Sequence, residues 1–190
     1  MRFLKSRGIL AVGIVALAQT LVLATMIHDR TSLLRNGQEV ILKAEPVDPR
    51  SLFRGDYVIL NYPVSTTTVS AEEKARIVAA QRAYVRLGKG ADGNWEARGA
   101  TASWPVTVSA GEVVLAGRPD LTWWGGFGDT EVRLRYGIES YFVAEGTGLA
   151  LEQLVRDKKL DVMLAINDRG KAAIKALVLD GKVVHEEPLY

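Results

Sequence analysis

Four charged residues lie close together in one proline-flanked segment of the sequence. Asp48 and Arg50 follow Pro46 closely, and Arg54 and Asp56 precede a run of apolar residues. Two arginines at this spacing can form a fork for an anionic group, because guanidinium groups donate paired hydrogen bonds to carboxylates and phosphates. The same four side chains can instead pair with one another and fix a turn. We favour this second interpretation and keep the anion site as the alternative.

The composition excludes several kinds of catalytic and binding site. The 190-residue chain has no cysteine and two histidines, His28 and His185. It therefore has no disulfide, no thiolate metal ligand and no cysteine nucleophile. The formal net charge of +2 is too small for a nucleic-acid-binding surface. We therefore expect no cofactor, no metal site and no nucleic-acid partner, and we assign no catalytic residue.

The N-terminal segment predicts a membrane anchor. Residues 9–27 form an uncharged, mostly apolar run of 19 residues, which spans about 28 Å as a helix and so matches the hydrocarbon core of a bilayer. Arg2, Lys5 and Arg7 precede this run, and no acidic residue occurs before Asp29. This charge bias places the N-terminus in the cytoplasm and the long C-terminal part of the chain on the other side of the membrane.

Two alternatives remain open for this segment. A cleaved signal peptide ending at Ala18 is one, although the apolar run continues to residue 27, which favours an uncleaved anchor. Gln19 is either a contact with another membrane helix or a tolerated polar residue. We expect the helix to continue until Gly37 stops it in a left-handed conformation. The predicted parts are a cytoplasmic stretch (1–8), a transmembrane helix (9–27), an extension and linker (28–37) and an extracytoplasmic domain (38–190).

The remaining residues predict an α+β domain built mostly on antiparallel sheet. Short apolar runs separated by turn residues predict strands near residues 40–44, 57–62, 83–87, 95–101, 112–117, 131–136, 162–166, 172–179 and 183–184. Residues 57–62 are apolar on both faces, which favours a central strand. Ser70 and Glu73 form a capping box before a short helix over 71–80, and a second helix is expected over 149–158. We expect Trp95 and Trp104 in the core.

A glycine-rich loop between strands carries three large aromatic side chains. Residues 121–128 read LTWWGGFG and contain Trp123, Trp124 and Phe127. Because glycine makes such a loop conformationally free, burying its rings costs entropy. The loop can fold back over the sheet edge, or it can contact the bilayer interface or a partner.

The most specific string is GDYVILNY at residues 55–62, which matches the pattern G-D-Y-x-x-L-x-Y without departure. It resembles the bacterial GDYXXLXY protein family. The PVDPR segment at residues 46–50 and the string YGIESYFVAEG at residues 136–146 resemble the same family. Tyr57 and Tyr62 fall on opposite faces of an extended segment, so at least one belongs to the core. The candidate positions are Asp48, Arg50, Arg54, Gly55, Asp56, Tyr57, Leu60 and Tyr62, with Tyr136, Gly137, Glu139, Tyr141, Phe142, Glu145 and Gly146 as a possible second motif.

The resemblance implies a small membrane-anchored protein and no particular enzymatic activity. Members of this family are often encoded beside a polytopic membrane protein, which makes such a protein a plausible partner. We therefore expect a non-enzymatic binding or assembly partner of a polytopic membrane protein. The alternatives are an envelope hydrolase or ligand sensor that uses Arg50, Arg54 and Asp56, and a purely structural spacer.

Overall fold

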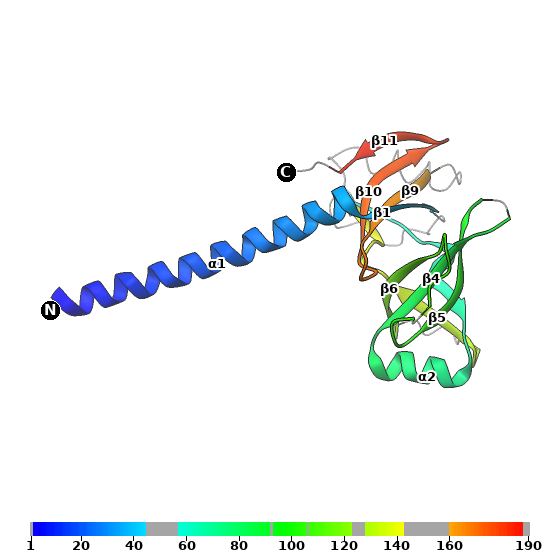
Figure 1. Cartoon of the computed structure of the whole chain (residues 1–190), viewed down its shortest axis with the longest axis horizontal. Helices are drawn as coiled ribbons and strands as arrows, with labels where there is room; N and C mark the ends of the chain where they lie inside the picture. Colours follow the sequence, from blue (N-terminus) through cyan, green and yellow to red (C-terminus); the bar gives the residue numbers. More distant parts are fainter. Residues whose placement is uncertain are drawn as a thin grey trace.

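A helix of 35 residues, α1 (Arg2–Asn36), projects from the rest of the molecule for most of its length (Figure 1). The computed structural model describes residues 2–44, 57–91, 93–105, 107–122, 128–142 and 160–187. Within these ranges, α1 contains the one helical stretch long and apolar enough to cross a membrane, Leu10–Asn36, with a mean hydropathy of 2.3 and no buried residues in its most apolar window. The hydroxyls of Thr20 and Thr25 donate to carbonyl oxygens of their own helix, at 2.9 and 2.7 Å, so they need no outside partner.

The folded part of the chain is built from antiparallel strands, which confirms the predicted α+β class. A four-stranded sheet has the order β1 (Gln38–Lys43), β9 (Leu160–Ile166), β10 (Ala172–Leu179) and β11 (Lys182–Glu186). A five-stranded sheet has the order β3 (Thr66–Thr68), β7 (Glu131–Arg135), β6 (Val113–Pro119), β4 (Ala83–Lys89) and β5 (Trp95–Thr101). A separate pair consists of β2 (Tyr57–Ile59) and β8 (Ser140–Phe142), and a 3₁₀ turn covers Pro63–Ser65.

One hydrophobic core joins the two larger sheets. Leu87 and Leu115 from the five-stranded sheet belong to the same buried cluster as Leu164 and Leu177 from the four-stranded sheet. At the contact between the sheets, the Ala116 amide donates to the Gly170 carbonyl at 2.8 Å. Gly170 has a φ of +78°, and an added Cβ would lie 2.9 Å from the Ala116 nitrogen. Glycine is therefore required at this turn for the sheets to approach each other.

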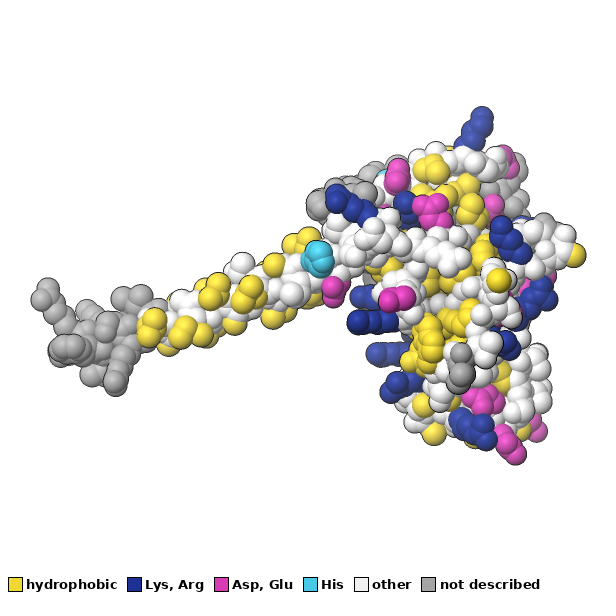
Figure 2. Space-filling view, viewed as in Figure 1, with side chains coloured by type: hydrophobic (Ala, Val, Ile, Leu, Met, Phe, Trp, Pro, Cys, Tyr) yellow, Lys and Arg dark blue, Asp and Glu magenta, His cyan; other side chains and the backbone are white. Residues whose placement is uncertain are grey.

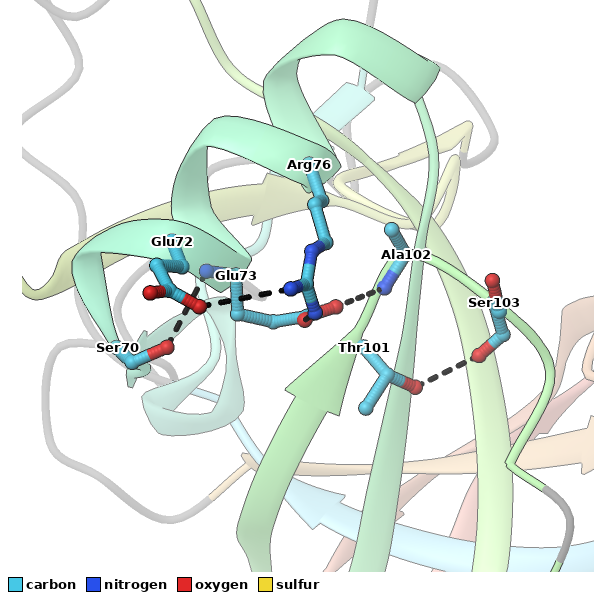
Figure 3. A network of polar contacts seen from close by, with 7 residues as sticks. All are labelled: Ser70, Glu72, Glu73, Arg76, Thr101, Ala102 and Ser103. Atoms are coloured by element: carbon cyan, nitrogen blue, oxygen red, sulfur yellow. Dashed lines mark hydrogen bonds and ion pairs between the residues drawn. The ribbon is translucent and has the colours of Figure 1, made fainter.

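The short helix α2 (Ala71–Ala80) has the predicted bounds, but its capping differs in part from the prediction (Figure 3). The Ser70 hydroxyl accepts a hydrogen bond from the Glu73 amide at 3.2 Å, as a capping box requires. The Glu73 carboxylate does not complete the box: one oxygen accepts from the Ala102 amide at 2.7 Å and the other pairs with Arg76 at 3.0 Å. Glu73 thereby ties α2 to the end of β5.

Three sequence expectations are wrong in this structure. Residues 57–62 do not form a central strand, since β2 ends at Ile59 and pairs with β8 alone among the described strands. Trp104 is 42% exposed and packs edge-on against Tyr84, with ring centroids 5.3 Å apart, whereas Trp95 does pack partly buried against the core. Gly37 does not adopt a left-handed conformation. The helix predicted over 149–158 lies outside the described residues.

Candidate functional site

The two sequence strings that resemble the family meet in space. Strands β2 and β8 pair antiparallel, with Tyr57 opposite Phe142 and Ile59 opposite Ser140. The backbone pairing extends one step further, because the Leu60 amide donates to the Glu139 carbonyl at 2.8 Å. Two segments that are far apart in the sequence therefore form one structural unit, which we call the motif unit (residues 57–64 and 136–142).

Two tyrosines of the motif unit exchange hydrogen bonds between its segments. The Tyr62 hydroxyl donates to the Ile138 carbonyl at 2.8 Å, and the Tyr136 hydroxyl donates to the Val64 carbonyl. Both side chains are buried, with Tyr62 1% exposed. Burial raises the pKa of each hydroxyl well above its usual value, and the nearby Glu139 carboxylate raises both pKa values further. These hydroxyls therefore stay protonated and link the two segments.

The Glu139 carboxylate closes the turn between β7 and β8, within the second segment of the motif unit. Its two oxygens accept hydrogen bonds from the amides of Tyr136 and Gly137, the latter at 3.0 Å. Gly137 has a φ of +80°, a conformation that glycine adopts at low cost. A carboxylate that accepts two backbone N–H bonds stabilises this turn. The chemistry of the motif unit is therefore that of a structural clamp.

We expect Glu139→Ala to lower the free energy of unfolding by about 1.5–3 kcal/mol, because two backbone donors lose a charged acceptor. Glu139→Gln is expected to cost less, since its amide oxygen still accepts one of the two bonds. Urea unfolding followed by circular dichroism measures both changes, and Glu112→Ala, a carboxylate that accepts one exposed backbone bond, is the control. Equal stability of Glu139→Ala and the parent protein would contradict the clamp.

The motif unit is also connected to α1. The Tyr141 hydroxyl donates to one Glu187 oxygen at 3.3 Å, and the other Glu187 oxygen pairs with Arg30 of α1 at 3.4 Å. Burial and then the Glu187 carboxylate raise the pKa of the Tyr141 hydroxyl. The Tyr141 ring also packs edge-on against His185, with centroids 5.6 Å apart. The ion pair between Arg30 and Glu187 is partly exposed to solvent and contributes little stability. It does show that Glu187 lies between α1 and the motif unit and contacts both.

The end of α1 docks on the four-stranded sheet through side chains that the sequence analysis missed. Leu33 and Leu34 are 4% and 3% exposed and pack with Ala165 of β9 and Ala173 of β10. Gly37 allows this approach, since a Cβ there would lie 2.6 Å from the Leu33 oxygen and 2.9 Å from the Ile166 nitrogen. Two adjacent leucines in the otherwise polar stretch after residue 27 could have predicted this contact from the sequence.

Several predicted site residues lie outside the described residues. They are the charged group and its glycine (Asp48, Arg50, Arg54, Gly55 and Asp56), the end of the second motif (Glu145 and Gly146) and the aromatic loop residues (Trp123, Trp124 and Phe127). The anion site, the turn network and the contact loop therefore stay predictions. Of the candidate positions within the described ranges, Leu60, Tyr62, Tyr136 and Tyr141 are buried. In that same part of the chain, no three His, Asp or Glu side chains group as metal ligands.

Comparison with known proteins identifies the family. A family model described as GDYXXLXY protein matches residues 19–177, from the middle of α1 to near the end of β10. Searches of curated proteins and of solved structures gave no match. The match covers most of the chain, including both halves of the motif unit and the docked end of α1. The chain belongs to the GDYXXLXY protein family.

Proposed function

We propose that this protein is a single-pass membrane protein whose sheet domain is presented on the extracytoplasmic face of a bacterial inner membrane. There it serves as a non-enzymatic binding or assembly partner of a polytopic membrane protein. The observation that carries the proposal is the continuity of α1 from its apolar stretch to the two leucines that are buried on the four-stranded sheet. An anchor of this kind fixes the height and orientation of the domain, which a binding partner in the same membrane can exploit.

The packing at the junction supports a rigid connection. Leu33 and Leu34 are buried on β9 and β10, and β1 begins at Gln38, directly after the helix. No stretch of flexible linker separates α1 from the sheet. A protein that only needed to be tethered would work with a loose linker, whereas one that presents a surface to a membrane neighbour benefits from a fixed orientation.

The sidedness follows from the charges that flank the apolar stretch. Arg2, Lys5 and Arg7 precede it without an acidic neighbour, so the positive-inside rule favours a cytoplasmic N-terminus. The exposed Gln19 in the middle of α1 is the one strongly polar side chain of the span and supports a contact with another membrane helix.

Photocrosslinking in cells tests the proposal. A photoreactive amino acid replaces Gln19 in the full chain, and a matched control replaces Leu17, which lies about 200° around the same helix and is also exposed. We expect a discrete adduct from Gln19 and not from Leu17, with a captured protein that has several membrane spans. That protein should also copurify with the unmodified chain in mild detergent.

Two results would contradict the proposal. One is recovery of the full-length chain as a soluble protein without detergent, which would remove the anchor. The other is identical crosslinking patterns from Gln19 and Leu17 together with purification as a lone chain in every detergent.

A further inference from the structure

A basic groove opens between the two larger sheets. Four basic side chains line it: Arg82, Arg118, Arg135 and Lys171. The groove has a volume of about 850 Å³. Among the described residues, none of these four bases forms an ion pair. The groove therefore presents cationic groups that remain available to an anion.

Two carboxylates also line the groove, and both accept hydrogen bonds from groups within their own turns. Glu139 accepts from the two backbone amides of its turn. Asp120 accepts from the Thr122 hydroxyl at 2.7 Å and from the Thr122 amide at 3.1 Å. The Thr122 hydrogen bond, with a smaller contribution from nearby arginines, lowers the pKa of Asp120. The four bases outnumber the two acids, so the groove keeps a positive character.

The groove adjoins a second hollow at the point where α1 leaves its apolar stretch. Lys171 lines both hollows, and the second one also includes His28 and Asp29 of α1. Its other charged residues are Glu112, Asp168 and Arg169, so the basic excess belongs to the groove and not to this hollow. The other wall of this hollow carries Trp104 and Val108, which are 42% and 39% exposed. Figure 2 shows Lys and Arg side chains gathered along the edge of the domain on the side from which α1 projects. The basic groove and the hollow with the exposed apolar residues thus adjoin at Lys171.

The length of α1 places the edge of the domain around α1 next to the lipid headgroups. Residue 27 is the last of the apolar run, and Leu33 is already buried on the sheet. The six helical steps from residue 27 to Leu33 advance about 9 Å along the helix axis. The headgroup region adds about 5–8 Å on each side of the hydrocarbon core. The edge of the domain around α1 therefore begins where the headgroups end.

We propose that this face, defined by Arg82, Arg118, Arg135, Lys171, Trp104 and Val108, binds anionic phospholipid headgroups. Arginine side chains bind phosphate oxygens in pairs, and basic residues near a membrane are attracted to anionic lipids. Trp104 suits the interfacial region because its ring is amphipathic. The inference rests on the membrane anchoring proposed above and adds the lipid class that the domain recognises.

Lipid quenching in nanodiscs tests the inference with the full chain. Because the chain has no cysteine, Val108→Cys gives a single site for a fluorophore, and Ala91→Cys in the β4–β5 turn, which lines neither hollow, is the control site. The nanodiscs contain phosphatidylcholine with or without phosphatidylglycerol, and a small fraction of lipid with a headgroup nitroxide. We expect strong quenching at position 108, an increase when phosphatidylglycerol is present, and little quenching at position 91.

Charge variants identify the groups responsible. In phosphatidylglycerol nanodiscs, R118Q/K171Q is expected to reduce the quenching at position 108 by about twofold or more. K43Q/K182Q removes the same charge outside both hollows and should leave it unchanged. Soluble glycerophosphate at matched ionic strength should also have no effect, because a lipid surface presents many headgroups at once.

Each contrary result has a distinct meaning. A full chain that does not remain with the nanodiscs overturns the anchoring itself. If quenching at position 108 changes neither with phosphatidylglycerol nor with R118Q/K171Q, the lipid inference is overturned and the anchoring is left intact. Loss of quenching with glycerophosphate would show that the groove binds a free phosphate compound instead of a membrane surface.

Discussion

Tyr62→Ala is expected to lower the free energy of unfolding of the sheet domain by about 3–5 kcal/mol. The side chain is fully buried in the main core, and its removal leaves a cavity there. It also leaves the Ile138 carbonyl without its donor. Because the free energy of unfolding of small domains is about 5–15 kcal/mol, this single change removes a large part of the stability of the domain.

Phenylalanine variants separate the hydroxyl from the ring. Tyr62→Phe and Tyr136→Phe each leave one buried carbonyl unpaired, and we expect each to cost about 1–3 kcal/mol. Tyr84→Phe is the matched control, since the described contacts of Tyr84 are made by its ring against Trp104. Urea denaturation curves of the single and double variants form a double-mutant cycle. Stabilities equal to that of Tyr84→Phe would contradict the exchange of hydrogen bonds.

The raised pKa values of the Tyr62 and Tyr136 hydroxyls predict that the domain loses stability at alkaline pH. Burial raises their pKa in the folded protein above the usual value of about 10, so the unfolded chain releases these protons first as the pH rises. Their contribution is complete below about pH 10 and is lost above it. The parent protein should therefore lose stability above that pH more steeply than the Tyr62→Phe/Tyr136→Phe variant. Parallel pH profiles would contradict this expectation.

Local sequence patterns were sufficient for most of the elements. The hairpin of β9 and β10 surrounds Asn167, whose side chain accepts from the amides of Arg169 and Lys171, as the turn residues predict. The alternation of charged and apolar residues over 131–135 gives the expected half-buried strand. These features depend on neighbours within a few residues, which the sequence shows directly.

Contacts between distant segments were not predictable in the same way. Gly37 was expected to stop α1 by its own backbone conformation, yet its role is to let α1 approach β9, a strand from the other end of the chain. Trp104 was expected in the core because it is large and isolated in sequence, but hydrophobicity alone does not show whether a partner surface covers it. The motif pattern identified Tyr62 and Tyr136, whereas their carbonyl partners emerge only when β2 pairs with β8.

The Leu33→Asp/Leu34→Asp variant is expected to release α1 from the sheet while the domain stays folded. Each truncation of a buried leucine costs about 2–5 kcal/mol, and an unpaired buried carboxylate costs more. The cluster of Leu33, Leu34, Ala165 and Ala173 is separate from the main core, so its loss should be local. Gly37→Val should have the same effect by a different route, because its side chain would collide with the backbone of α1 and β9.

Distance measurements distinguish a docked helix from a released one. Nitroxide labels at Asp29→Cys and Lys182→Cys, both exposed and introduced into a chain without cysteine, report the separation of α1 from the four-stranded sheet by pulsed electron paramagnetic resonance. We expect a narrow distribution in the parent protein and a broad one in both variants. Leu23→Asn, at an exposed position in the apolar stretch of α1, should keep the narrow distribution. If both junction variants also keep it, the leucines do not orient the domain. If they broaden it without reducing crosslinking from Gln19, the partner recognises α1 alone and the fixed orientation serves another purpose.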